Sequence, residues 1–328
     1  MPQPGDARWL DAAARLAARA RPLSRPNPAV AAIIVRDGKV LGRGWTQTGG
    51  RPHAEAVALA EAGVAADGAT LYVTLEPCAH PSVRGPACAD LIARSRLSRV
   101  VVGVADPDPR TAGQGMARIA AAGIAAELQP SPACRASLAG YLMQRSASRP
   151  HITLKLATSL EGSIAQANGT SQWITDEPAR AHAHVLRAGC DAILVGAGTL
   201  RADSPTLDVR LPGLEQRSPQ RWVLTNGTAP EGWNVLHAPQ QITSAMPDVQ
   251  YLMIEGGAGA AAAFLGADLV DRLVLYRAPI LIGGGKPALG DIGLTSLADA
   301  HGRWQMTDHR QLGNDTMEVY ERSPCSPE

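Results

Sequence analysis

The sequence predicts a chain of two α/β domains, and three observations support this fold class. The chain has 328 residues, and at about 100–200 residues per domain this length suits about two domains. Short β-branched runs alternate with segments of helical period, which is typical of a sheet with helices on its faces. Residues 129–150, with three prolines and several serines, separate two such alternating halves.

Composition excludes several other classes of protein. Hydrophobic residues make up 45% of the chain and charged residues 19%, which fits a globular protein. The formal charge of +1 and the aromatic content of 4% argue against a broad basic surface or a base-stacking platform for nucleic acid. No apolar run reaches the roughly 18 residues of a membrane span, and the N-terminal segment alternates alanine with charge and lacks a signal sequence. We therefore expect a cytoplasmic protein with neither nucleic acid nor membrane as its partner.

The five cysteines are an odd number, thinly spread. In a chain without an export signal disulfides are not expected, so thiols with a role are metal ligands or buried core residues. Only Cys78 and Cys88 lie close together in the sequence.

In the first half the elements follow in order. Residues 9–20 have a helical period, and residues 29–45 form two apolar runs around Asp37-Gly38, a dipeptide favoured in two-residue hairpin turns. Residues 53–63 read as a helix closed by Gly63. We expect strands at 70–77, 99–106 and 125–128, separated by helices at 88–96 and 116–124.

The composition of residues 129–150 suits a connector with one short helix. The second half is again α/β but does not repeat the first. We expect strands at 152–158, 191–196, 221–225, 251–257 and 272–278, with helices at 176–189 and 258–266. The predicted domains are residues 1–145 and 146–328.

A candidate zinc site stands in the first half. His53-Ala54-Glu55 begins a predicted helix, Pro77-Cys78 follows a strand, and Cys88 comes ten residues later. A catalytic zinc takes three protein ligands and keeps a fourth position for water. H-x-E with P-C and a second Cys is the arrangement of zinc deaminases, in which the Glu stays off the metal and moves protons. We expect His53, Cys78 and Cys88 to bind zinc and Glu55 to be the catalytic acid and base, with both cysteines at the start of the next helix, where its positive end stabilises thiolates.

Two other interpretations remain beside this one. Nine residues separate the cysteines, whereas the deaminase signature has two. A nucleic-acid (tRNA) deaminase with an appended nucleotide-binding domain is the first alternative, and the neutral charge, few aromatics and this spacing argue against it. The second is a structural zinc site in a nucleotide-binding scaffold, which would usually need a fourth protein ligand, and only His80 is a candidate.

Four segments of the first half resemble the deaminase half of the bifunctional riboflavin-biosynthesis deaminase/reductase: RPNPAVAAIIVRDGKVLGRGW, PHAEAVAL, TLEPCAH with the later Cys, and ADPDPRTAGQGMARIAAAGI. The resemblance implies a cytidine-deaminase-like three-layer α/β/α domain. It also implies zinc-dependent hydrolytic deamination of 2,5-diamino-6-(5-phosphoribosylamino)pyrimidin-4-one, a small phosphorylated pyrimidine. Zinc lowers the pKa of a bound water to about 7, and Glu55 would take its proton and later return it to the departing ammonia.

The chain departs from the family at two places in this half. The loop between the cysteines, Pro81 to Ala87, is one residue longer than usual and lacks the GRTPP core, so its substrate contacts are open. Thr46 stands where the family usually has His. Asn27 matches a substrate-contacting Asn, although an Asn between two prolines also suits a turn.

Residues 151–323 resemble the same family's reductase domain, which has a dihydrofolate-reductase-like α/β fold. The motifs are RPHITLKLATSLEG, GTSQWIT, LRAGCDAILVGAGTLRADSPTLDVR and EGGAGAAAAFL. The last is a strand, a Gly-Gly turn and a helix, which can expose N–H groups to an anion or serve tight packing. The resemblance implies NADPH as cofactor, with its pyrophosphate held by Gly257, Ala258, Gly259, Ala260, Ala261, Ala262 and Ala263. Its other implied contacts are Ala157, Trp173, Thr199, Asp203 and Asn226, the last at a position usually held by Ser.

The implied substrate residues of the reductase are Ser171, Arg187, Leu207, Arg210 and Glu255. A planar guanidinium can hold a phosphate with two hydrogen bonds, although either Arg could also be a solvated surface charge. Lys155 lies in an apolar strand, where it either extends to solvent or sits near the reacting sugar. The implied reaction is hydride transfer from NADPH to the opened ribosyl group, giving a ribityl group, and the family suggests a homo-oligomer, a dimer or tetramer.

Overall fold

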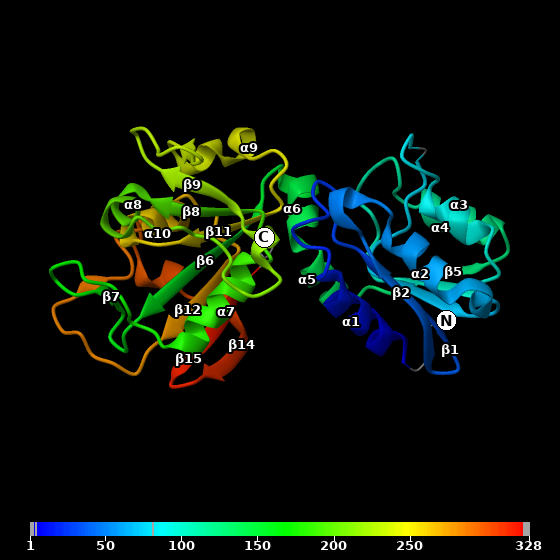
Figure 1. The fold of residues 1–328 in the computed structure, drawn as a ribbon, viewed down its shortest axis with the longest axis horizontal. Helices are drawn as coiled ribbons and strands as arrows, with labels where there is room; N and C mark the ends of the chain where they lie inside the picture. Colours follow the sequence, from blue (N-terminus) through cyan, green and yellow to red (C-terminus); the bar gives the residue numbers. More distant parts are fainter. Residues whose placement is uncertain (1–2, 4, 81, 324–328) are drawn as a thin grey trace. The chain divides into compact units, whose positions relative to one another are not determined.

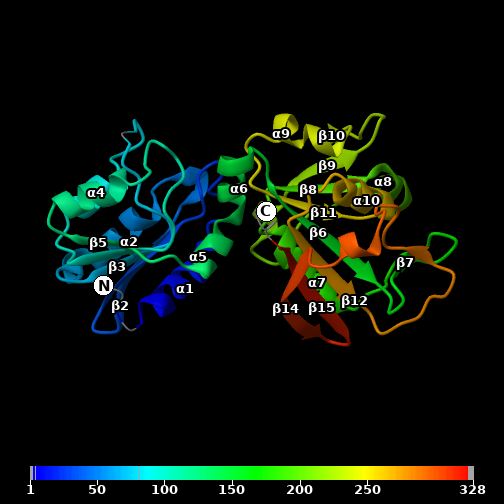
Figure 2. The same cartoon turned by 180° about the vertical axis from the view of Figure 1, so that it is seen from behind.

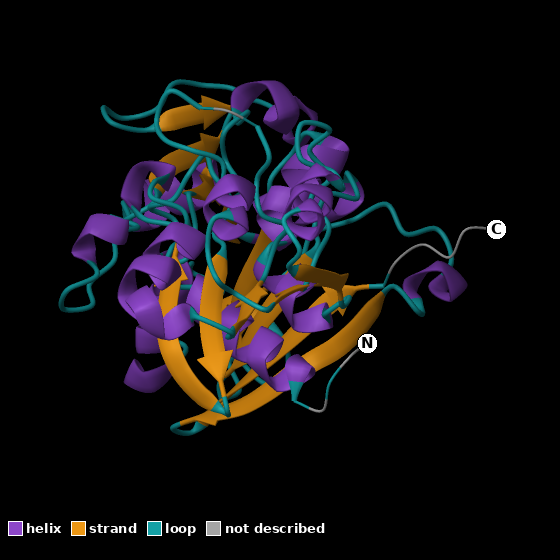
Figure 3. Ribbon diagram, turned by 90° about the vertical axis from the view of Figure 1, so that its right-hand side faces the viewer, coloured by secondary structure: helices purple, strands orange, loops and turns teal. Residues whose placement is uncertain are grey.

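The computed structural model describes residues 3, 5–80 and 82–323. The chain divides into two compact units, Met1–Ser148 and Arg149–Glu328 (Figure 1). Both units combine helices with strands (Figure 3). Among the described residues, no helix is long and apolar enough to cross a membrane.

The first unit contains a five-stranded sheet in the order β2-β1-β3-β4-β5. Its first two strands form the expected hairpin, because Asp37 (φ 52°) and Gly38 (φ 73°) both have the positive φ of a tight two-residue turn. The pairs β1–β2 and β1–β3 are antiparallel, and β3–β4 and β4–β5 are parallel. The strands are β1 (Ala31–Arg36), β2 (Lys39–Trp45), β3 (Thr70–Val73), β4 (Arg99–Val102) and β5 (Ala125–Leu128).

Helices cover both faces of this sheet, as strand alternation requires. Ile34 and Val73 pack in one core cluster with α2 (Ala54–Ala62), α3 (Cys88–Ala93) and α4 (Gln114–Ala121). Ile33 and Tyr72 pack in another, with α1 (Asp6–Ala17) and α5 (Pro132–Ser137). Figures 1 and 2 show these two helical layers from opposite sides. The expected three-layer α/β/α fold is therefore confirmed.

The prediction of a connector with one short helix at 129–150 was wrong. This region forms two helices, α5 and α6 (Ala139–Ala147), which contribute buried residues to the first unit. Cys134 is fully buried there, and Leu138 and Tyr141 join its core. Prolines misled the prediction: Pro132 occupies the first turn of α5, where it favours a helix. The boundary that we propose between residues 145 and 146 lies in the last turn of α6.

The second unit contains an eight-stranded sheet in the order β10-β9-β8-β11-β6-β12-β15-β14. Strands β10, β9, β8, β11, β6 and β12 are parallel, and β15 and β14 continue the sheet antiparallel. They comprise β6 (His151–Thr158), β8 (Ala192–Gly196), β9 (Gln220–Leu224), β10 (Asn234–Leu236), β11 (Tyr251–Glu255), β12 (Arg272–Arg277), β14 (Trp304–Leu312) and β15 (Asp315–Arg322). A separate two-stranded sheet pairs β7 (Ser163–Ala165) with β13 (Lys286–Pro287).

The helices of this unit also pack on both faces. One core cluster joins β6, β8 and β11 to α9 (Ile242–Ala245) and α10 (Ala258–Gly266), and another joins β12 and β15 to α7 (Glu177–Arg187). A further helix, α8 (Ala197–Asp203), follows β8. Strands β7, β10, β13, β14 and β15 and helices α8 and α9 were not expected. The edge strand β14 shows why, since most of its residues are exposed and it lacks an apolar pattern.

Candidate active sites

His53, Cys78 and Cys88 come together in the first unit, as expected. Each offers one ligand atom, and the three atoms lie within 4.8 Å of one another. His53 Nδ1 lies 3.3 Å from the Sγ atom of Cys88 and 3.5 Å from that of Cys78. Tetrahedral zinc with bonds of 2.0–2.3 Å places its ligand atoms about 3.5 Å apart, so the separations fit this metal. His80 is not in this cluster, which leaves a fourth position for water.

The ligands come from the beginnings of two helices and one loop. His53 immediately precedes α2, and Cys88 is the first residue of α3. The expectation that Cys78 also lies at a helix start was wrong, because Cys78 belongs to the loop after β3. Its sulfur accepts a hydrogen bond from the Cys88 backbone N–H at 3.3 Å, so α3 contributes a dipole to both sulfurs. A side-chain hydrogen bond from the Cys88 thiol, with smaller contributions from His53 and from this backbone N–H, outweighs burial and lowers the pKa of the Cys78 thiol to about 4, as a metal-binding thiolate requires.

Glu55 lies in the first turn of α2 and is only 3% exposed. Burial raises the pKa of its carboxyl group above the ordinary value, which suits a group that must both accept and release a proton. Cys134 and Cys190 are buried elsewhere and form no disulfide within the described residues, and Cys325 lies outside those residues.

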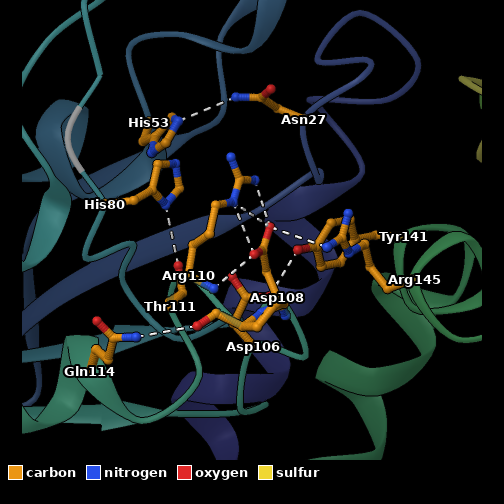
Figure 4. A network of polar contacts seen from close by, with 11 residues as sticks. Asn27, His53, His80, Asp106, Asp108, Arg110, Thr111, Gln114, Tyr141 and Arg145 are labelled. Carbon is orange, nitrogen blue, oxygen red and sulfur yellow. Dashed lines mark hydrogen bonds and ion pairs between the residues drawn. The ribbon is translucent and has the colours of Figure 1, made fainter.

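The substrate side of this site begins with Asn27. Its Nδ2 atom donates to Gly50 O at 3.0 Å and lies 3.3 Å from His53 Nε2 (Figure 4). Thr46, at the position where the family has His, is buried, and its hydroxyl donates to Pro28 O and accepts from Val30 N–H. Thr46 therefore holds the segment beside Asn27.

Sequence reasoning missed a polar network beside the metal ligands (Figure 4). The Asp108 carboxylate binds the Arg110 guanidinium through Nε at 3.0 Å and Nη2 at 2.6 Å, and Arg145 approaches it at 3.4 Å. Asp106 accepts a hydrogen bond of 2.8 Å from the Tyr141 hydroxyl. Both aspartates and Arg110 lie in the segment ADPDPRTAGQG, but Tyr141 and Arg145 come from α6, in a region that the sequence predicted to be a connector.

Glu76, also missed, connects this network to the zinc ligands. It is 3% exposed and precedes Pro77-Cys78. Its carboxylate accepts backbone N–H bonds from Asp106, Gly113 and Met116 at 3.1–3.3 Å. One buried side chain thus fixes the 106–116 segment against the loop that carries Cys78.

His80 touches the same segment, because its Nδ1 atom lies 3.4 Å from Thr111 Oγ1. Pro81, in the lengthened loop, lies outside the described residues.

In the second unit, Lys155, Arg187 and Glu255 form a charged cluster. Lys155 and Glu255 are paired across β6 and β11, and Lys155 Nζ lies 3.8 Å from Glu255 Oε1. Arg187, on α7, donates to both carboxylate oxygens of Glu255 and to Asp208 O. Burial alone would raise the pKa of Glu255, but Lys155 and Arg187 outweigh it and lower this pKa. The guanidinium that we expected on a phosphate is thus already bound to a carboxylate.

The remaining substrate residues form no ion pair with this cluster in the described structure, although Arg187 bonds to Asp208 O, next to Leu207. Leu207 is buried with φ 55°, and Arg210 is exposed, 3.7 Å from Asp208. Ser171 Oγ donates to Asp203 at 3.5 Å.

The expected cofactor residues lie at the carboxyl ends of neighbouring strands. Gly256 has φ 145°, and a Cβ there would lie 2.9 Å from Thr199 Oγ1, so this turn requires glycine. At Gly259 an added Cβ would meet no atom within 4 Å, so the start of α10 is open. These features fit a pyrophosphate at a helix start. Ala260, Ala261 and Ala262 are instead buried in the core, whereas Gly257, Ala258 and Ala263 are partly exposed.

Three other expected cofactor residues, Trp173, Asn226 and Ala157, are at least partly exposed. Trp173 is 65% exposed, with the Arg180 guanidinium 4.9 Å from its ring centroid. Asn226 is exposed just after β9, and Ala157 lies on β6 and is partly exposed.

The first unit has a three-ligand metal site beside a buried glutamate, which is the arrangement of a zinc-dependent deaminase. The second unit has a parallel sheet with a glycine turn suited to a nucleotide cofactor, as in a nucleotide-dependent reductase. Comparison with known proteins gives the same result. The cytidine and deoxycytidylate deaminase zinc-binding region matches residues 4–104, and the RibD C-terminal domain matches residues 150–317.

The relatives span nearly the whole chain. The riboflavin biosynthesis protein RibD of Mycobacterium tuberculosis is 38% identical over 308 residues, which cover 89% of this chain and 90% of that protein. RibD of Escherichia coli is 35% identical over 360 residues, covering 94% and 97%. The structure of Acinetobacter baumannii RibD has a TM-score of 0.84 at 32% identity, covering 97% of this chain and 99% of that one. The structure of a diaminohydroxyphosphoribosylaminopyrimidine deaminase/5-amino-6-(5-phosphoribosylamino)uracil reductase from Thermotoga maritima has a TM-score of 0.83 at 26% identity, with the same coverage.

The chain belongs to the RibD family of riboflavin biosynthesis proteins. It is a bifunctional enzyme, a zinc-dependent deaminase and an NADPH-dependent reductase. The resemblance found in the sequence is confirmed, and the tRNA-deaminase alternative is not favoured.

Proposed function

We propose that the first unit hydrolytically deaminates 2,5-diamino-6-(5-phosphoribosylamino)pyrimidin-4-one and that the second reduces the ribosyl side chain of the product to ribityl with NADPH. The observation that carries the first step is the set His53, Cys78 and Cys88 beside the buried Glu55. Support for the substrate comes from the Thermotoga maritima relative, whose name specifies this pyrimidine and its uracil product.

In the deaminase step, His53 and the two thiolates would hold zinc, which when bound supplies an acidified water. Glu55 would accept a proton from that water and deliver it to the amino group that leaves as ammonia. Asn27 would orient the pyrimidine beside His53. Because Glu55 is only 3% exposed, its carboxylate would exchange this proton with the substrate and not with bulk water.

In the reductase step, the glycine turn at Gly256 and Gly257 and the open start of α10 at Gly259 would hold the cofactor pyrophosphate, and Thr199 would line the turn. Lys155 would lie beside the ribosyl group, with Glu255 holding its ammonium in place at 3.8 Å. Lys155 Nζ also lies 5.7 Å from the centroid of the buried Tyr276 ring, so it is held from two directions. This geometry favours the role near the sugar over extension to solvent.

The experiment is ammonia release from the diaminopyrimidine substrate, run with and without NADPH. Glu55→Gln should retain one zinc per chain and release ammonia at least about 10³-fold more slowly, since the general acid and base is lost. It should also oxidise no NADPH with the diaminopyrimidine, but should do so with the deaminated product. Turnover like that of the unchanged enzyme, or NADPH oxidation with the diaminopyrimidine itself, would contradict the assignment.

We also propose that the protein is cytoplasmic and forms a homo-oligomer, a dimer or a tetramer. Its two domains would comprise residues 1–145 and 146–328. The resemblance to the family supports this proposal. Light scattering during size-exclusion chromatography measures the mass, and a single species of about 34 kDa would contradict it.

A further inference from the structure

Residues 105–148 form a part of the first unit that neither family model matches, since the matches cover residues 4–104 and 150–317. This part contains the helix α6 and the 106–116 segment, which Glu76 fixes against the loop of the zinc ligands. Figure 4 shows the helix and the segment joined by polar contacts. Because α6 supplies none of the three candidate metal ligands, its contribution to the site must come through this segment.

Two buried carboxylates make the contact with α6. The Tyr141 hydroxyl donates to Asp106 Oδ1 at 2.8 Å, and Arg145 Nη2 lies 3.4 Å from Asp108 Oδ2. Asp106, Asp108 and Tyr141 are each no more than 8% exposed. Burial of a carboxylate is costly, and a buried ion pair contributes little more to stability than apolar residues of the same volume. What these contacts supply is a fixed geometry for the segment.

The two aspartates shape the turn at 108–112. Asp106 Oδ1 also accepts the backbone N–H of Asp108 at 3.0 Å, and Asp108 Oδ1 accepts that of Arg110 at 3.0 Å. Asp108 O accepts the backbone N–H groups of Thr111 and Ala112, both at 2.8 Å. A displacement of either aspartate would therefore move Arg110 and Thr111.

Thr111 connects this turn to the loop of the zinc ligands. It is fully buried, and its hydroxyl oxygen lies 3.4 Å from His80 Nδ1. His80 follows Cys78 by two residues in the loop after β3. The turn that α6 supports thus lies against the loop that supplies a metal ligand.

Arg110 is the exposed member of the turn, with 63% of its side chain accessible. Asp108 holds it along one edge, through Nε at 3.0 Å and Nη2 at 2.6 Å. Its Nη1 atom forms no hydrogen bond with any described residue, and in Figure 4 the guanidinium extends toward Asn27 and His53. A guanidinium that is held along one edge and free at the other is a preorganised hydrogen-bond donor.

We propose that Arg110 binds an oxygen atom of the pyrimidine substrate through this free edge, and that Tyr141 and Arg145 are positioning residues, which act through Asp106 and Asp108. This inference rests on the proposed substrate of the deaminase. It extends the deaminase site from the zinc-binding region to α6, the last helix before the second unit.

The first test compares two buried tyrosines with the same chemistry. Tyr72, on the other face of the sheet, donates to Asp6 Oδ1 at 2.8 Å, the same distance as in the Tyr141 pair. Tyr72→Phe and Tyr141→Phe each remove one hydroxyl, so we expect similar shifts of the urea midpoint. Only Tyr141→Phe should raise KM for the diaminopyrimidine, by about tenfold, with kcat within about twofold and zinc content unchanged.

The second test asks whether the effect passes through Arg110. Arg110→Gln should raise the same KM at least about tenfold, and adding Tyr141→Phe should raise it little further, because Tyr141 acts through Arg110. Arg145→Gln should raise KM about threefold, and Arg145→Lys should restore it, since one ion pair needs only the charge. Arg96→Gln is the matched control: Arg96 also pairs with an aspartate, Asp67, at 3.1 Å, and its loss should leave KM unchanged.

A second substrate locates the oxygen that Arg110 binds. If the effect of Arg110→Gln on KM disappears with the dephosphorylated diaminopyrimidine, the oxygen belongs to the phosphate. If the effect persists, the oxygen belongs to the ring or the sugar. An effect with neither substrate would refute the contact.

Two results would overturn the positioning role. One is a KM that stays unchanged in Tyr141→Phe or rises equally in Tyr72→Phe, since the hydroxyl would then serve stability alone. The other is a double variant in which the effects of Tyr141→Phe and Arg110→Gln multiply. NADPH oxidation with the deaminated product should be the same in all variants, and a change there would place the effect in the second unit.

If the unchanged protein releases no ammonia from the diaminopyrimidine, the proposed substrate is refuted, and hydrogen–deuterium exchange then decides the positioning role. Tyr141→Phe should speed exchange of the backbone N–H groups at 108–112, which depend on the aspartates, and Tyr72→Phe should not. Equal exchange rates in the two variants would refute the role of α6.

Discussion

Replacing Glu76 by Gln should separate the stability of the deaminase unit from its metal binding. The Glu76 carboxylate accepts three backbone N–H bonds from the 106–116 segment, and all of them are 3.1–3.3 Å long. Its Oε2 atom accepts two of these, from Asp106 and Gly113. A glutamine in the same position has only one acceptor oxygen, so its NH₂ group would face at least one N–H donor.

The size of the effect follows from these contacts. Hydrogen bonds to a charged group contribute about 1.5–3 kcal/mol each, and a buried donor left unpaired costs about 1–3 kcal/mol. A glutamine with its oxygen at the Oε2 position keeps two of the bonds and loses the one from Met116, so the free energy of unfolding of the first unit should fall by about 3 kcal/mol. Because the segment also carries Asp108 and Arg110, deaminase turnover should fall while zinc content stays the same.

The assay is urea unfolding followed in parallel with zinc content and ammonia release. Glu61→Gln is the matched control: its exposed carboxylate accepts one backbone N–H bond, from Arg43 at 2.7 Å, and its loss should cost less than about 1 kcal/mol. Equal stability losses in the two variants would refute the reasoning. So would a Glu76→Gln protein with normal unfolding and lowered zinc content, because Glu76 would then act on the metal.

The two remaining predictions concern buried ion pairs. Asp6 accepts two hydrogen bonds of 2.9 Å from the Arg99 guanidinium. Burial alone would raise the pKa of Asp6, but these bonds and its other hydrogen bonds lower this pKa from 3.8 to about 2. The pair therefore contributes about 2 kcal/mol of stability above pH 4, and this contribution is lost as the pH falls toward 2. The stability difference between the unchanged protein and Asp6→Asn, measured by urea unfolding at pH 7, 4 and 3, should therefore shrink with acid, and a difference independent of pH would contradict the pairing. Glu255→Gln leaves the Arg187 guanidinium, 12% exposed, without its carboxylate and should lower the free energy of unfolding of the second unit by about 3 kcal/mol. Ammonia release should be unaffected by this substitution, and a second unit as stable as before would show that Arg187 finds another partner.

Local signals in the sequence were sufficient for several features. Asp37-Gly38 predicted the hairpin because a tight turn requires positive φ at both positions. His53, Cys78 and Cys88 could be named as zinc ligands because zinc chemistry restricts the residue types, although only the fold shows that their atoms meet. Strands with continuous apolar runs, such as β4 and β8, were located correctly, because a strand that is buried on both faces must consist almost entirely of apolar residues.

Contacts between distant segments could not be predicted in this way. Tyr141 reaches Asp106 because α6 packs on the first unit, and a proline-rich composition concealed that helix. Edge strands such as β14 were missed because they pack on little and their side chains face solvent.

The sequence by itself thus determined the two α/β halves, the zinc ligands with Glu55, and the family, because these depend on residue type and short spacing. Only the tertiary structure placed Glu76 between the metal loop and the 106–116 segment, bound Glu255 to Arg187, and joined α6 to that segment through Tyr141. The physical reason is that hydrogen bonds and ion pairs act over a few ångströms. Which groups come within that range depends on how the helices and strands pack.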